Sequence, residues 1–171
     1  MRADLYWEEC VSINGSWCYN ASYTSYRPYT DLIRFLVECV SKGGNLLLNV
    51  GPDANGRIPE EYGDAFRKMG EWLKFNGDSI YGCDIADLPK PEWGRLTQKG
   101  KKIYAHVQHK TIGQKVIPGL KGKVEKARIL SDNSEVKIVE PWNAKYAQGD
   151  DNLFMAVPDI GKDVVVELTL K

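Results

Sequence analysis

The chain has 171 residues, of which 43% are hydrophobic and 27% charged, and its 23 Lys and Arg residues balance 23 Asp and Glu residues. This composition is typical of a globular protein. The balanced charge predicts no basic surface for nucleic acid, and no apolar run is long enough to span a membrane, so we expect neither partner.

The first residues contain no apolar signal core, so the localisation is unknown from the sequence, and cytoplasmic if Met1 is the true start. None of the four cysteines stands in a CxxC pair. We therefore predict no metal site and expect buried free thiols.

A strand is predicted within residues 6–13, followed by a loop over residues 14–28 that is rich in Asn, Ser, Gly and Tyr. Aromatic residues in such a loop either stack on a ligand or cover the end of the fold. Thr30 is predicted to cap a helix that runs to about Ser41, with apolar residues at helical spacing.

The most informative stretch is the apolar run over residues 45–50, which glycines bound on both sides. It predicts a strand buried on both faces. The loop over residues 51–58 follows, and Pro59 is predicted to begin a helix that Gly77 ends. Helix, strand and helix at this spacing indicate a parallel α/β sheet or barrel, whose sites lie in loops after the strands.

Beyond Gly82 the apolar pattern changes from helical to alternating, after a connector at residues 88–91 that contains two prolines. The predicted strands cover residues 94–97, 103–108, 115–117, 124–130, 136–139, 153–157 and 164–170. Short strands separated by turn signals indicate an antiparallel sandwich. We therefore predict an α/β domain over residues 1–86 and an all-β domain over residues 87–171.

Three blocks suggest a known family: WEECVSINGSWCYN at 7–20, VSKGGNLLLNVGP at 40–52, and GEWL with the following Asn-Gly and Ile-Tyr-Gly at 70–82. These blocks closely resemble the α-L-fucosidases of glycoside hydrolase family 29. The resemblance implies that an α/β fragment, the last two units of a (β/α)8 barrel, precedes the all-β antiparallel sandwich. It also implies that most of the barrel is absent from this chain.

Members of that family are retaining glycosidases, which need two carboxyl groups about 5 Å apart. In the family both carboxylates come from sequence before the first matching block, so we predict no catalytic residue here and an inactive fragment. Glu8 and Glu9 are adjacent on a strand and point to opposite faces, so they cannot flank one bond. Glu8 alone is predicted to orient a neighbour in the site or to be structural.

The resemblance places Trp17 at an aromatic position that lines the pocket around the C5 methyl group of fucose. An apolar wall there favours a 6-deoxy sugar over hexoses that carry a hydroxyl. The alternative is that Trp17 only packs within its loop. Asn49 either reaches the substrate or, as we favour, bonds to the adjacent loop backbone. His106 and His109 are expected to be surface or packing residues.

The resemblance implies a fucosylated glycan as substrate, no cofactor, and the missing N-terminal barrel portion as partner. The alternative is a non-catalytic carbohydrate-binding or interaction module built on the sandwich. The loop that carries Trp17 disfavours this alternative, because a free-standing sandwich would not need it.

Overall fold

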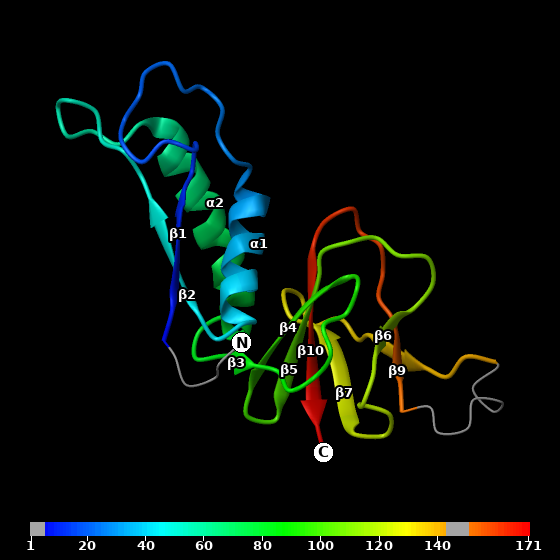
Figure 1. Ribbon diagram of the computed structural model, residues 1–171. Helices are drawn as coiled ribbons and strands as arrows, with labels where there is room; N and C mark the ends of the chain where they lie inside the picture. Colours follow the sequence, from blue (N-terminus) through cyan, green and yellow to red (C-terminus); the bar gives the residue numbers. More distant parts are fainter. Residues whose placement is uncertain (1–5, 143–150) are drawn as a thin grey trace. The chain divides into compact units, whose positions relative to one another are not determined.

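The computed structural model describes residues 6–142 and 151–171, and the chain divides into two compact units, Met1–Gly77 and Asp78–Lys171 (Figure 1). The predicted division between residues 86 and 87 lies nine residues later. A short strand, β3 (Asp84–Ile85), pairs with the sheet of the second unit, so residues 84–85 lie with that unit. The assignment of the two parts to a barrel and a sandwich domain stays a prediction.

The first unit consists of β1 (Glu8–Ser12), α1 (Tyr29–Val40), β2 (Asn45–Asn49) and α2 (Glu60–Asn76). The two strands are parallel and in register from Glu8 beside Asn45 to Ser12 beside Asn49. Figure 1 shows them side by side, with the helices beside them. The predicted order of strand, helix, strand and helix is confirmed.

Each helix of the first unit begins directly after a proline, and a side-chain cap does not define either start. Pro28 and Pro59 occupy the N-cap positions of α1 and α2, with ψ near 142° and 147°. The prediction that Thr30 caps this helix was therefore wrong. The Pro28 carbonyl accepts the first helical hydrogen bonds, so α1 begins after Pro28 and Thr30 is its second residue. Apolar residues of α1 are buried as predicted, namely Leu32, Ile33, Val37 and Cys39.

Two predictions of burial in the first unit were wrong. β2 is partly exposed, and the Leu47 side chain is 40% exposed. Within the described residues β2 pairs with β1 alone, so the unit is too small to cover both faces of the strand. Cys10 and Cys18 are exposed thiols, whereas Cys39 is buried.

The second unit begins around the 3-10 helix η1 (Gly77–Ser79) and is otherwise an antiparallel β structure. One sheet has the order β3-β4-β5-β10-β7, and the other has the order β6-β9-β8. Beyond β3, the strands are β4 (Gly94–Lys99), β5 (Lys102–Val107), β6 (Lys115–Ile117), β7 (Val124–Ile129), β8 (Lys137–Val139), β9 (Leu153–Ala156) and β10 (Val164–Leu170). The antiparallel architecture is confirmed, whereas β3 was missed because two residues carry no pattern.

The core of the second unit draws on inward residues of both sheets. The fully buried members include Ala105, Val166 and Leu168 from the five-stranded sheet and Ile117 and Met155 from the other. Their alternation with outward residues is the period-2 pattern that predicted the strands. Among the helices that the structure describes, none has both the length and the apolar character needed to cross a membrane.

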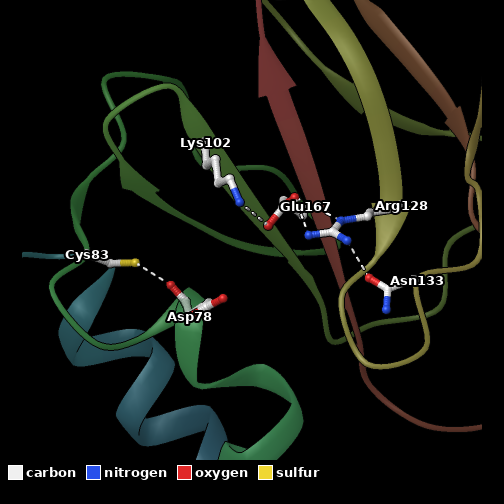
Figure 2. A network of polar contacts seen from close by, with 6 residues as sticks. All are labelled: Asp78, Cys83, Lys102, Arg128, Asn133 and Glu167. Carbon is white, nitrogen blue, oxygen red and sulfur yellow. Dashed lines mark hydrogen bonds and ion pairs between the residues drawn. The ribbon is translucent and has the colours of Figure 1, made fainter.

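The other face of the five-stranded sheet carries a buried polar network (Figure 2). Glu167 of β10 is 3% exposed and accepts hydrogen bonds from Arg128 at 2.9 Å and Lys102 at 3.0 Å. Arg128 also donates to Asn133. Burial alone would raise the pKa of Glu167, but the two cations hold it below its usual value. Because Glu167 also lies beside Tyr104 in the strand register, burial and this carboxylate raise the pKa of Tyr104 to about 12.

Candidate functional site

The loop between β1 and α1 is ordered by short polar turns. The Asn14 side chain accepts a hydrogen bond from the Ser16 amide at 3.1 Å, and the Ser16 hydroxyl donates to the Cys18 carbonyl at 2.7 Å. Further along, the Asn20 side chain accepts from the Ser22 amide at 2.9 Å. Asn and Ser side chains therefore replace regular secondary structure here, in turns that such residues favour.

Residues at and just beyond the carboxyl end of β2 contact this loop near Trp17 and hold its backbone in place. The Asn49 amide donates to the Trp17 carbonyl at 2.7 Å. Two residues on, Gly51 lies so close to the backbone of Cys18 and Tyr19 that a Cβ would overlap it. The backbone hydrogen bond predicted for Asn49 is confirmed, and a role in contacting substrate stays a prediction.

The backbone of this loop is held while its aromatic side chains remain open. The side chain of Trp17 is 55% exposed, and those of Tyr19 and Tyr23 are also exposed. By contrast, Tyr26 contacts the buried Tyr62 edge-on, with ring centroids 5.3 Å apart. An exposed indole on a fixed backbone is suited to stacking on the apolar face of a sugar.

Glu8 lies away from this loop. It is the first residue of β1 and pairs with Asn45, whereas Ser12 and Asn49 end the two strands. Glu8 is four positions before Ser12 on the strand, a distance of about 13 Å from the loop end. Its carboxylate is exposed and accepts a weak hydrogen bond from the Cys10 thiol, with 3.8 Å between Sγ and Oε1. The structure therefore brings Trp17 and Asn49 together but places Glu8 at the other end of the sheet.

Two features of this region were not identified from the sequence. The loop after β2 closes on Asp53, whose carboxylate accepts from the amides of Asn55 at 2.8 Å and Arg57 at 2.9 Å. The Asn14 side chain also bonds Tyr62, and burial raises the pKa of that tyrosine. The Asp-x-Asn-Gly sequence signals the turn, but nothing local signals the long-range pairing of Asn14 with Tyr62.

Comparison with known proteins shows similarity to α-L-fucosidases. A family model described as alpha-L-fucosidase matches residues 2–78. The plasma alpha-L-fucosidase of Homo sapiens is 45% identical over 107 residues, which is 58% of this chain and 23% of that protein. The alpha-L-fucosidase of Dictyostelium discoideum is 46% identical over 106 residues, again covering 23% of that protein.

Solved structures extend the similarity to both units. Alpha-L-fucosidase isoenzyme 1 from Paenibacillus thiaminolyticus matches with a TM-score of 0.90 and 48% identity, over 98% of this chain and 40% of that chain. A GH29 alpha-L-fucosidase from Bacteroides thetaiotaomicron matches with a TM-score of 0.85 and 27% identity, over 97% of this chain and 38% of that chain.

These relatives are glycoside hydrolases. The chain is similar to the C-terminal part of the α-L-fucosidases of glycoside hydrolase family 29. It spans 23% of the length of the curated relatives described above and about two fifths of the solved structures.

Proposed function

We propose that this chain supplies the C-terminal part of an α-L-fucosidase that hydrolyses terminal α-L-fucosyl bonds in glycans with retention of configuration. The observation that carries the proposal is the 48% identity to a fucosidase structure over 98% of the chain. On this proposal residues 1–86 are the last two units of a (β/α)8 barrel, and residues 87–171 are the sandwich domain that follows it.

The catalytic carboxylates come from the preceding part of the barrel, which is the partner of this chain. A retaining mechanism needs a nucleophile and an acid/base group about 5 Å apart. Glu8 and Glu9 leave adjacent positions of β1 toward opposite faces, so they do not form such a pair. The strand pairing supports a missing partner, because within the described residues β1 and β2 pair only with each other. Glu8 has a structural role, because it lies at the end of β1 away from the Trp17 loop.

The chain contributes the apolar wall of the sugar pocket through Trp17. Its exposed indole would contact the C5 methyl group of fucose, and an L-galactoside would bring a hydroxyl to the same surface. Burying that hydroxyl without a hydrogen-bond partner is unfavourable, which gives selectivity. Asn49 and Gly51 hold the backbone that presents the ring.

The test is hydrolysis of an aryl α-L-fucoside by the purified chain, alone and mixed with the N-terminal three fifths of the Paenibacillus relative. We expect no turnover alone and turnover in the mixture. Clear turnover by the chain alone, lost on Glu8→Gln or Glu9→Gln, would overturn the assignment of the carboxylates. Sugar affinity of a monomeric chain that maps to residues 87–171 would instead support a carbohydrate-binding module.

In an active mixture, Trp17→Ala should lower kcat/KM for the fucoside about 10- to 100-fold and reduce discrimination against the α-L-galactoside. Trp142→Ala is the matched control, because Trp142 is 84% exposed and lies in the second unit. Equal effects of the two substitutions would contradict the role of Trp17.

A further inference from the structure

A histidine is buried on the outer face of the five-stranded sheet, apart from the loop that the proposed function uses. His106 lies in β5 and is 2% exposed. Its neighbours in the strand register are Arg95 in β4 and Val165 in β10. A residue of this kind is seldom buried without a specific set of hydrogen bonds, so its partners define what it does.

The hydrogen bonds of His106 fix which ring nitrogen carries the proton. The Thr97 hydroxyl donates its only proton to the Ser79 carbonyl at 2.7 Å. At 3.1 Å from Thr97 Oγ1, His106 Nε2 must therefore donate to that oxygen. The neutral ring then leaves Nδ1 as an acceptor, and in the described part of the chain Nδ1 is buried without a hydrogen-bond partner.

Through Thr97, His106 supports the segment at residues 78–83, which we call the strap. Ser79 of the strap is fully buried, and its carbonyl is the one that Thr97 holds. Lys99 of β4 also holds the strap to the sheet, because its ammonium group donates to the Tyr81 carbonyl at 2.9 Å. Within the strap, the Cys83 thiol donates to the Asp78 carbonyl at 3.2 Å (Figure 2).

A second proton on His106 would be unfavourable while the strap is closed. It would create a buried cation whose Nδ1–H has no acceptor. The charged and titratable groups on this side of the sheet come from four strands and the strap. They are Arg95 and Lys99 from β4, Lys102 and Tyr104 from β5, Glu167 from β10, Lys126 and Arg128 from β7, and Asp78, Tyr81 and Cys83 from the strap. The Glu167 carboxylate is already bonded to two cations. Burial lowers the pKa of His106 from 6.5 to about 3, with the Ser79 carbonyl opposing this shift.

We propose that His106 is an acid-sensitive latch, whose protonation opens the strap from the five-stranded sheet. The ring is neutral when the strap is closed and takes up a proton when opening admits water. Since the closed-state pKa lies below the ordinary one, acid favours the open state, and the closed state is fully favoured only above about pH 6.5. From a shift of 6.5 to about 3, the open-to-closed ratio rises about 30-fold between pH 8 and pH 5.

Hydrogen exchange of the whole 171-residue chain tests the latch at pH 8, 6.5 and 5, with rates corrected for the intrinsic pH dependence of exchange. The strap amides should lose protection about 30-fold between pH 8 and pH 5, while β9 and β10 keep theirs. Equal losses in β10 would show global unfolding and overturn the proposal, as would a strap without acid response.

Two variants distinguish the effect of protonating His106 from the effect of its hydrogen bond to Thr97. His106→Gln retains an amide donor toward Thr97 but cannot be protonated, so strap protection should become independent of pH. Thr97→Val should weaken the strap at every pH while the acid response remains. An unchanged acid response in His106→Gln would refute the latch. If that variant does not fold, histidine NMR of the wild type decides: His106 must stay a neutral Nε2–H ring at pH 5 in the closed state, with the exposed His109 as comparison.

Discussion

A single buried carboxylate illustrates how individual residues stabilise the second unit. Glu167 is bound by two cations whose side chains still reach water, 27% exposed for Arg128 and 42% for Lys102. The ion pairs of Glu167 with these two cations are therefore only partly exposed to solvent. They differ both from fully exposed ion pairs, which contribute little to stability, and from fully desolvated ones. Its contribution comes mainly from avoiding an uncompensated charge inside the sheet.

We predict that Glu167→Gln lowers the free energy of unfolding by about 1–3 kcal/mol at pH 7, because charged hydrogen bonds to two partly exposed cations are lost. The folded pKa of Glu167 lies below 4.5, so its stabilisation is complete above that pH and declines as pH falls through the lowered value. The difference between wild type and variant should therefore shrink at pH 4 relative to pH 7, in urea denaturation. The control is Glu125→Gln, an exposed position of β7, and an equal loss there would contradict the prediction.

The Asn49 side chain is the residue-scale link between β2 and the Trp17 loop. Asn49→Ala removes one hydrogen bond to the Trp17 carbonyl, and we expect a cost of about 1 kcal/mol. Hydrogen exchange of residues 16–19 should become faster, while α1 remains protected. Unchanged exchange in this loop would mean that the close contact at Gly51 alone holds it.

At the scale of elements, the start of β2 depends on space for a tryptophan ring. The Trp7 ring occupies the place where a Cβ on Gly44 would lie, and its indole N–H donates to the Lys42 carbonyl at 3.1 Å. The contact between Trp7 and Gly44 therefore sets the relative position of the two chain segments that lead into β1 and β2. Gly70, within α2, has open space around its missing Cβ.

Opposite effects of alanine are expected at these two glycines. Gly44→Ala should destabilise the first unit by about 1–3 kcal/mol, because the ring of Trp7 must move. Gly70→Ala should stabilise it by about 0.5–1 kcal/mol, because alanine restricts the unfolded chain and favours the helix. Urea denaturation followed by helical circular dichroism measures both, and loss of stability in Gly70→Ala would show an unrecognised constraint on α2.

At the scale of the whole molecule, the two units have unequal means of stability. The second unit has its own core between two sheets. In the first unit, one two-stranded sheet and two helices leave strand residues such as Leu47 exposed. An exposed strand surface of this kind favours association with a partner.

Residues 78–171 alone should therefore unfold cooperatively, with a denaturation midpoint close to that of the corresponding transition in the whole chain. Residues 1–77 alone should aggregate or unfold at low denaturant. Size-exclusion chromatography and urea denaturation of the two pieces test this expectation. A monomeric, cooperatively folded first unit would contradict it.

Local patterns in the sequence determined the elements well. Period-2 alternation located β6 and β10 at their observed bounds, and the helical spacing of Leu32 and its neighbours located α1. The hydrogen bond from the Asn49 side chain to the backbone of the adjacent loop was also predicted, since an amide at a strand end has few other partners nearby. These properties depend on residues close together in the chain or on a side chain's own chemistry.

Only the tertiary structure decided the properties that need distant partners. It showed that Glu8 lies a strand's length from Trp17, that β2 is half exposed, and that His106 shares Thr97 with the Ser79 carbonyl. Burial and hydrogen-bond partners depend on which elements are packed together, and a sequence pattern specifies the face of a strand without specifying what covers it.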